Sequence, residues 1–285
     1  MSNLEISRAE RLDQYVVRKQ PGLSRGFANR LIQDGDVLVN GEPQTKAGYK
    51  VRLSDKIKIG FDENKAVIFP EIDIPVIYED DDCVVINKPT GLLTHSKGAF
   101  NPEATVSTWL RARMQAPKGE RAGIVHRLDR ATSGVMICAK TPEALGKLQK
   151  QFSERKAKKS YIAVVSGVPK EPQALIDMPI ERNPKQPQTF RVGSNGKSAQ
   201  TEYKVLKTNG QLSLLELKPT TGRTHQLRVH LKYLGHPIVG DTLYGGQSAE
   251  RLFLHALSLE ITLPNRERKT FRTSLPPEFD KLIAA

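Results

Sequence analysis

The chain has 285 residues, 38% of them hydrophobic, which is enough for one large domain beside a small one. It carries 44 Lys and Arg against 31 Asp and Glu, and the net charge of +13 favours a polyanionic partner, with a merely solvated basic surface as the alternative. With two cysteines and no stretch near the ~18 apolar residues of a membrane span, composition excludes a disulfide framework and a transmembrane protein. The N-terminus lacks an apolar segment, so we expect a cytoplasmic protein without membrane contact.

The basic excess is unevenly distributed along the chain. Residues 1–60 hold 11 basic against 7 acidic side chains, residues 61–90 hold 2 against 8, and residues 91–285 hold 31 against 16. We therefore expect a nucleic acid to contact mainly the last of these segments. The acidic stretch at residues 61–72 is expected to be a linker that does not bind it.

Residues 1–60 predict a compact module of two helices followed by short strands. Apolar spacing predicts a helix over Arg8–Arg18, and Ser24 can cap a second helix that ends at Gly35. Residues 36–41 predict a strand entering a hairpin, because the closing Asn-Gly pair tolerates the positive φ of a tight turn. Further strand pattern is supplied by Val51, Leu53, Ile57 and Ile59.

This module resembles the small RNA-binding domain that is named after a protein of the small ribosomal subunit. The resemblance makes four arginines candidate phosphate contacts: Arg8, Arg11, Arg25 and Arg30. For each of them an ordinary exposed helix charge is the alternative. We expect this domain at residues 1–60, the linker at 61–72 and a second domain at 73–285.

The sequence of the second domain predicts strands that are separated by turns and a few helices. Asp80–Asp82 predict a turn between two strands, and Thr141 followed by proline predicts the start of a helix. Further strands are expected at residues 161–165, 212–217 and 257–262.

The run from Gly123 to Gly134 contains the carboxylate that we expect to carry the chemistry, Asp129. It lies between Arg127 and Arg130, and nearby cations keep a carboxylate ionised, as a nucleophile requires. Taken alone, this short string is also typical of a structural salt-bridge turn.

Five further segments favour the catalytic interpretation, because they match the pattern of one family in order. They are Lys88–His95, Lys159–Ala163, Thr221–His230, Gly235–Asp241 and Leu254–Ala256. Together with the Asp129 run they resemble the RluA-type pseudouridine synthases, which convert uridine in RNA into its carbon-linked isomer. The resemblance implies an α+β fold, in which the small N-terminal α/β-rich RNA-binding module precedes a mixed, largely antiparallel sheet with flanking helices and a central cleft.

The same resemblance implies the roles of three residues. Asp129 attacks the ribose anomeric carbon or removes a ribose proton, and the sequence leaves both routes open. Arg223 is expected to pair with Asp129 through its planar guanidinium, with phosphate binding as the alternative. Tyr161 offers a ring for stacking on a base and a hydroxyl for proton transfer, with a core aromatic as the alternative.

Asp129 cannot reach a uridine inside a stem, so the base has to be flipped out. The resemblance places Arg127 in the space that the base vacates, with His126 beside it. Arg130 is a further candidate RNA contact. Phosphate steering is also expected from a cluster before Tyr161, with a solvated helix end as the alternative: Arg155, Lys156, Lys158 and Lys159.

Two other motifs do not support different chemistry. Gly193–Ser198 ends like a phosphate loop, but Arg191 occupies the position of the first glycine, so we expect a hairpin tip. His225 and His230 are five residues apart, which places them on different helical faces, and no cysteine pair supplies further ligands. We expect neither a metal nor a cofactor.

The sequence thus predicts a cofactor-free RNA isomerase that acts as a monomer. Two alternatives come from other classes: a non-catalytic RNA-binding or ribosome-assembly factor, and a glycosylase that releases the base. The N-terminal module together with Gly98–Val106 resembles the RluD-like members, which act on large-subunit ribosomal RNA. A 23S ribosomal RNA substrate is therefore expected, with transfer RNA as the alternative.

Overall fold

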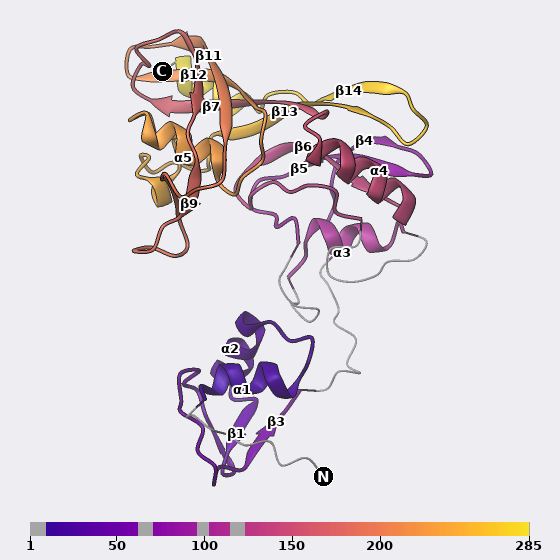
Figure 1. Ribbon diagram of the computed structural model, residues 1–285, viewed down its shortest axis with the longest axis vertical. Coiled ribbons are helices and arrows are strands. Elements are labelled where there is room, and N and C mark those ends of the chain that lie inside the picture. The colour runs from indigo at the N-terminus through magenta and orange to yellow at the C-terminus, as the bar shows by residue number, and fades with distance from the viewer. Residues whose placement is uncertain (1–9, 62–70, 96–102, 115–122, 285) are drawn as a thin grey trace. The chain divides into compact units, whose positions relative to one another are not determined.

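A computed structural model describes residues 10–61, 71–95, 103–114 and 123–284 (Figure 1). These residues form two compact units: one holds 10–61, Glu71, His95 and 103–108, and the other holds 72–94, 109–114 and 123–284. The expected boundaries at residues 60 and 72 stay a prediction. No helix within the described ranges is long and apolar enough to cross a membrane.

The first unit combines two helices with a small antiparallel sheet of order β2-β1-β3. Ser24 caps the second helix by accepting a hydrogen bond from the Phe27 N–H, and Gly35 has a left-handed φ of 83° just beyond it. Asn40 and Gly41 also have positive φ and close the hairpin, as predicted. The elements are α1 (Leu12–Lys19), α2 (Arg25–Gln33), β1 (Val37–Val39), β2 (Glu42–Pro43) and β3 (Ile57–Ile59).

The strand pattern predicted through Val51 and Leu53 is only partly formed. Val51 is buried in the core of this unit, whereas Leu53 is 78% exposed and lies in a turn. The Asp55 carboxylate accepts a hydrogen bond from the Arg52 N–H at 2.8 Å and thereby closes that turn. The strand therefore begins only at Ile57.

The second unit is built on a nine-stranded sheet. Its order is β4-β5-β6-β13-β7-β12-β11-β8, and β14 pairs with β13. All of its described pairs are antiparallel except β6 with β13. β9 (Ile180–Arg182) and β10 (Phe190–Val192) form a separate hairpin. The sheet strands are β4 (Val76–Glu79), β5 (Cys83–Lys88), β6 (Ser133–Ala139), β7 (Lys158–Ser166), β8 (Gln173–Asp177), β11 (Gln200–Thr208), β12 (Leu212–Pro219), β13 (Leu254–Thr262) and β14 (Arg268–Arg272).

Helices flank this sheet, with α4 beside β6 and α5 beside β7 (Figure 1). Leu148 of α4 packs in one apolar core with β5, β6 and β13, and Leu231 of α5 packs in a second core with β7, β12 and α6. The predicted α+β fold with a mixed, largely antiparallel sheet is thus confirmed. The helices are α3 (Val106–Arg111), α4 (Pro142–Ser153), α5 (Gln226–Tyr233), α6 (Pro277–Ala284) and the short 3-10 helix η1 (Thr242–Tyr244).

Local sequence signals in this unit also have the predicted structures. The Asp80 carboxylate accepts hydrogen bonds from the N–H groups of Asp82 and Cys83 and so forms the turn between β4 and β5. Thr141 accepts a hydrogen bond from the Ala144 N–H and caps α4. These short-range bonds depend only on neighbouring residues, which is why the sequence predicts them well.

Gly134 determines how closely β6 approaches β13. Its φ is 112°, and a Cβ atom at this position would collide with the backbone of Ala256. Only glycine combines that conformation with that space. The close approach fixes the position of the loop before β6, which carries Asp129.

Candidate active site

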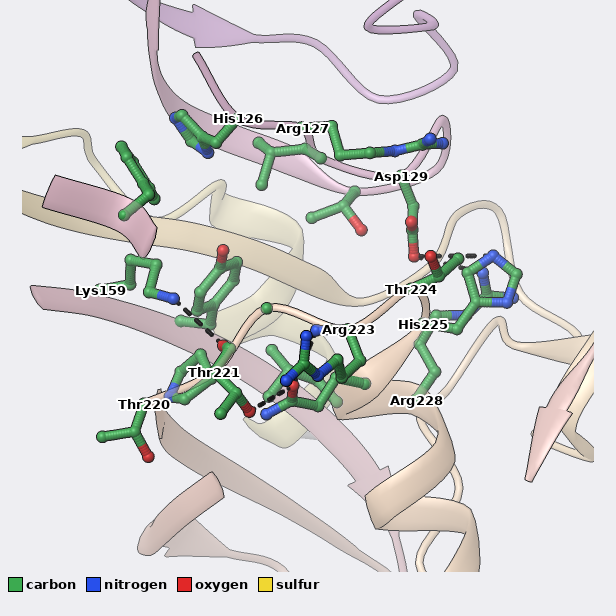
Figure 2. A pocket seen from close by; sticks show the side chains of 18 of the residues that line it. His126, Arg127, Asp129, Lys159, Thr220, Thr221, Arg223, Thr224, His225 and Arg228 are labelled. Carbon is green, nitrogen blue, oxygen red and sulfur yellow. Dashed lines mark hydrogen bonds and ion pairs between the residues drawn. The ribbon is translucent and has the colours of Figure 1, made fainter. Parts of the chain in front are cut away.

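A pocket of about 440 Å³ lies between the loop before β6, the loop before α5 and the strands β7 and β13 (Figure 2). Small-molecule sites occupy roughly 300–1,000 Å³, so the pocket is of the right size for one nucleotide. Many of the residues that the sequence singled out line it: His126, Arg127, Asp129, Arg155, Lys159, Tyr161 and Arg223.

Asp129 lies in a loop whose backbone is tied down on both sides. The Thr94 hydroxyl donates to the Leu128 carbonyl at 2.8 Å, and the Thr132 N–H donates to the Asp129 carbonyl at 3.1 Å. The side chain of Leu128 is buried. The Asp129 side chain keeps 18% exposure, so a ligand can reach it while most of the surrounding water is excluded.

Lys88, the last residue of β5, binds the backbone of this loop through its ammonium group. Its side chain is fully buried, and Nζ donates to the carbonyls of Pro89 at 2.9 Å, Leu92 at 2.8 Å and Arg130 at 3.2 Å. Burial lowers the pKa of Lys88 to about 7, while the negative charge of Asp129 acts in the opposite direction. One ammonium group thus joins the Lys88–Leu92 segment to the loop that carries Asp129.

The guanidinium that contacts Asp129 belongs to Arg228, in the first turn of α5. Its Nη1 lies 3.5 Å from Asp129 Oδ2. Nε and Nη2 donate to the two carboxylate oxygens of buried Asp241 at 2.7 and 2.8 Å, and the group lies 4.8 Å from the Tyr244 ring centre. The bidentate pair with Asp241 fixes the plane of the guanidinium and directs its remaining nitrogen towards Asp129.

This geometry corrects the predicted pairing of Arg223 with Asp129. Arg223 also lines the pocket, but it lies in the loop before α5 and donates from Nε to the Ser198 carbonyl at 3.0 Å. Gln226 shapes that loop, because its side-chain oxygen accepts hydrogen bonds from the Arg223 N–H and the Thr221 hydroxyl. The helical turn that follows brings Arg228 to the carboxylate instead.

Tyr161 lines the pocket from β7, where it pairs with Leu217 of β12 and Ala256 of β13. Burial raises the pKa of Tyr161, and the negative charge of Asp129 raises it further. The hydroxyl is therefore protonated at neutral pH and can donate a hydrogen bond in the pocket.

Lys159 also lines the pocket, and its Nζ donates to the Thr221 carbonyl at 3.2 Å. Burial lowers the pKa of Lys159 to about 8. The ammonium is charged at neutral pH, although only a small rise in pH removes its proton. The site thus combines an anionic carboxylate with a cation whose charge depends on pH.

His126 is placed as part of the pocket wall rather than as a cation. Its Nε2 accepts a hydrogen bond from the Ile137 N–H at 3.2 Å, and its ring stacks on Phe152 with centroids 4.4 Å apart. Burial lowers the pKa of His126 to about 3, so the imidazole is neutral and contributes no charge to phosphate binding. The neighbouring Arg127 is exposed and lines the same pocket, and Arg130 is exposed as well.

The basic cluster before Tyr161 is divided between the pocket and the surface. Arg155 and Lys159 line the pocket. The other two lysines form ion pairs elsewhere: Lys156 with Glu154 at 2.7 Å, and Lys158 with Glu260 at 3.4 Å. Exposed pairs of this kind contribute little to stability, so both lysines can exchange their partner for a phosphate.

Two of the four candidate arginines of the first unit have a structural partner. Arg11 and Arg25 bind the carboxylate of buried Asp13 at 2.9 and 2.7 Å, which joins α1 to the start of α2. Arg30 is exposed on α2. Arg8 lies outside the described residues.

Sequence reasoning missed Arg228, Asp241, His225 and Tyr244. A signal for Arg228 was present, because it lies between Leu227 and Val229 in a helix whose neighbours are apolar. An arginine in such a position is buried, and a buried guanidinium needs a carboxylate partner. For Tyr244 no such signal exists, since only the folded chain brings it to His225 and Arg228.

Comparison with known families agrees with this arrangement. Residues 82–233 match the family model described as RNA pseudouridylate synthase, and residues 10–57 match the S4 domain model. The first match spans the Asp129 loop, β7 and α5, from which the pocket is built. The second covers α1, α2, β1, β2 and the start of β3 in the first unit, in agreement with the resemblance.

Individual proteins give the same result. The chain is 41% identical to an "Uncharacterized RNA pseudouridine synthase" of Aquifex aeolicus, over 84% of this chain and 78% of that protein. It is 38% identical to the "Ribosomal large subunit pseudouridine synthase D" of Borreliella burgdorferi, over 95% and 88% of the two chains. The solved structure of "Human RNA Pseudouridylate Synthase Domain Containing 1" aligns with a TM-score of 0.61 at 31% identity, over 78% of this chain and 90% of that one. The chain therefore belongs to the RNA pseudouridylate synthase family, isomerases that act on RNA.

Proposed function

We propose that this protein isomerises uridines of 23S ribosomal RNA to pseudouridine, with Asp129 as the reacting carboxylate and the target base flipped into the pocket. The observation that carries the proposal is the position of Asp129. It lies at the wall of a nucleotide-sized pocket, partly exposed, with Arg228 at 3.5 Å and Tyr161 in the same lining.

The reaction rearranges bonds within a single nucleotide. The bond between ribose C1′ and uracil N1 breaks, the base turns while it is held, and C1′ bonds to uracil C5. The proton on C5 then leaves, and N1 gains a proton. Asp129 serves this sequence either as a nucleophile at C1′ or as a base that removes a ribose proton, and both routes need an ionised and immobile carboxylate.

Arg228 and Tyr161 supply what the carboxylate alone lacks. The guanidinium binds one oxygen of Asp129 in a fixed position, because it is itself fixed by its bidentate pair with Asp241. The protonated Tyr161 contributes an aromatic ring and a hydroxyl to the lining of the same pocket. This pair can hold the uracil ring during its rotation and exchange protons with it.

Arg127 and the basic residues around the pocket suit the extraction of the base. Flipping a base costs about a few kcal/mol, and a guanidinium that stacks in the vacated space recovers part of this free energy. Arg127 is exposed at the pocket rim, as this role requires. Lys159 and Arg155 lie where the phosphates of the extruded nucleotide can be bound.

The assignment of 23S ribosomal RNA is supported by the names of the relatives. The Borreliella burgdorferi protein is called a large-subunit pseudouridine synthase D, and a Vibrio parahaemolyticus protein of 34% identity, over 90% of this chain and 86% of that one, is called a large-subunit pseudouridine synthase C. An S4 domain beside the synthase domain also fits a structured RNA that offers more than one surface.

The activity is tested with RNA that carries tritium at uracil C5. Wild-type protein is expected to release label to water, and Asp129→Asn is expected to lose release while it still binds RNA. Asp280→Asn, which changes an exposed carboxylate on α6, is the control and keeps activity. Label release by the Asp129→Asn variant would exclude Asp129 as the reacting group, and free uracil among the products would identify a glycosylase.

The substrate is tested by mapping pseudouridine in total RNA with and without the gene. Loss of a pseudouridine from 23S ribosomal RNA is the expected result. Loss confined to transfer RNA would identify the alternative substrate. Unchanged pseudouridine in every RNA would contradict the proposed function as a whole.

A further inference from the structure

His225 faces the reacting carboxylate but belongs to none of the groups discussed so far. It lies directly before α5 and lines the pocket, and its Nε2 is 4.0 Å from Asp129 Oδ2 (Figure 2). Its other ring nitrogen, Nδ1, lies 2.7 Å from the hydroxyl oxygen of Tyr244. The imidazole therefore bridges the phenol of η1 and the loop that carries Asp129.

The hydrogen bonds of Tyr244 favour one tautomer of this imidazole. The Phe190 N–H donates to the Tyr244 oxygen at 2.9 Å, which uses a lone pair of the hydroxyl and leaves its proton available. That proton can be donated to Nδ1 of His225. The ring then carries its own proton on Nε2, which is the nitrogen that faces the carboxylate.

Burial favours the neutral form of the His225 ring. Burial lowers the pKa of His225, and the cations Arg228 and Arg127 lower it as well, while Asp129 and Asp241 act in the opposite direction. The net direction is downward. A neutral imidazole with Nε2–H directs a donor towards Asp129, and the present 4.0 Å separation has to shorten by about 1 Å before a hydrogen bond forms.

The backbone at His225 is itself in an unusual conformation. Its φ is 56° and its ψ is 20°, in the left-handed region that non-glycine residues rarely adopt. Such a conformation is unfavourable for a residue with a Cβ atom and is found mainly where the surroundings or the function require it. Here it turns the imidazole away from the helix and into the pocket.

We propose that His225 is a second positioning residue for Asp129, held in its Nε2–H tautomer by Tyr244. This inference rests on the proposed function. Within the described residues the polar contacts of the carboxylate, those to Arg228 and His225, both involve Oδ2. The two side chains thus lie next to the same carboxylate oxygen, Arg228 at 3.5 Å and His225 at 4.0 Å.

The test measures tritium release by the full-length protein for three variants. His225→Leu removes the donor. We expect kcat to fall by about 100-fold while KM changes less than about threefold, because a displacement of the reacting carboxylate by ~1 Å lowers the rate of the chemical step by about this factor. His225→Gln places an amide N–H near the position of Nε2 and should recover most of kcat. Tyr244→Phe keeps the ring beneath Arg228 but removes the hydroxyl, and should lower kcat by about tenfold.

A double variant shows whether Tyr244 acts through His225. If it does, Tyr244→Phe lowers kcat no further once His225→Leu is present, since the group that the hydroxyl orients is gone. His236→Leu is the matched control, because this imidazole follows the same helix, bonds the Ser166 carbonyl and does not line the pocket. It should leave kcat unchanged.

Several outcomes overturn the inference. Full kcat in His225→Leu excludes a positioning role, and equal loss in the Leu and Gln variants shows that only the shape of the side chain matters. If His225→Leu does not fold, as judged by circular dichroism, the Gln and Tyr244→Phe variants decide: Tyr244→Phe with normal kcat contradicts the inference. An inactive wild-type protein would instead contradict the proposed function, so the two failures are distinguishable.

Discussion

At the scale of single residues, the geometry of the site depends on which guanidinium nitrogens of Arg228 bind Asp241 and which one binds Asp129. Nε and Nη2 are used by Asp241, and Nη1 is the nitrogen that remains for Asp129. A lysine at this position would offer one ammonium on a flexible stem and could not hold both carboxylates in one plane.

We therefore predict different results for two conservative substitutions. Arg228→Lys should lower kcat by about 100-fold with little change in RNA affinity, because Asp129 loses its fixed partner. Arg223→Lys, at a residue that bonds a backbone carbonyl, should keep kcat within about threefold. Single-turnover tritium release measures the rate of turnover, and filter binding measures RNA affinity. An Arg223→Lys variant without turnover would indicate that Arg223, and not Arg228, is the partner of Asp129.

Lys159 leads to a prediction about RNA binding and pH. Because burial lowers its pKa to about 8, the ammonium is charged below that pH and loses its proton above it. RNA affinity should fall by about tenfold as pH rises from 7 to 9. A loss of this size is expected when one hydrogen bond from a charged donor to the RNA is removed. Lys159→Arg keeps its charge throughout this range and should abolish the fall. An unchanged slope in that variant would show that another group titrates.

At the scale of elements, the loop before β6 is joined to α4 and β6 through one imidazole. His126 stacks on Phe152 at the end of α4 and accepts the N–H of Ile137 in β6. The bond to Ile137 requires the neutral ring, since a protonated Nε2 has no lone pair for the amide. Protonation of His126 therefore breaks the bond between this loop and β6.

This leads to a prediction about stability in acid. The pKa of His126 is about 3 in the folded protein and rises to its ordinary value of about 6.5 on unfolding. The unfolded chain thus binds one more proton between these values, and the free energy of unfolding decreases as pH falls from about 6.5 towards 3, by up to about 1.4 kcal/mol per pH unit. His126→Phe keeps the stacking and removes the proton.

Urea unfolding between pH 6.5 and 4 measures the effect. The variant should be less stable at neutral pH, because the Ile137 N–H loses its acceptor, but its stability should depend less steeply on pH than that of the wild type. Parallel curves for the two proteins would contradict the assignment of this proton to His126.

At the scale of the whole molecule, the net charge of +13 includes arginines with different tasks. Arg25 of α2 is bound to buried Asp13, whereas Arg30 on the same helix is exposed. Only side chains of the second kind can neutralise a phosphate without loss of a structural bond. The charge total alone does not distinguish them.

We predict that Arg30→Gln lowers the salt dependence of RNA binding and leaves stability unchanged. The slope of log affinity against log salt should decrease by about 0.7–0.9, the value for one phosphate contact. Arg25→Gln should instead lower the melting temperature, because Asp13 loses one of its two cations while it stays buried. The same slope in wild type and Arg30→Gln would place this part of α2 away from the RNA.

The sequence predicted those features that depend on near neighbours. The Ser24 and Thr141 caps, the Asp80 turn and the Asn40-Gly41 hairpin are set within a few residues, and all are present. Asp129 and Tyr161 were placed in one pocket through the resemblance. The partner of Asp129 was assigned wrongly, because Arg223 and Arg228 carry the same charge and only the geometry of the turn before α5 separates them.

The tethered backbone around Asp129 has a consequence for the choice of target. Lys88, Thr94 and Thr132 hold the loop at separate points, so it is not built to travel towards a base that stays stacked. The RNA therefore has to change conformation by extruding the target base, and the free-energy cost of that extrusion varies with the local base pairing. Two uridines in identical sequences would be modified at different rates if one lies in a loose loop and the other in a stable stem. The fixed loop thereby makes the choice of target depend on how easily a uridine leaves its stack.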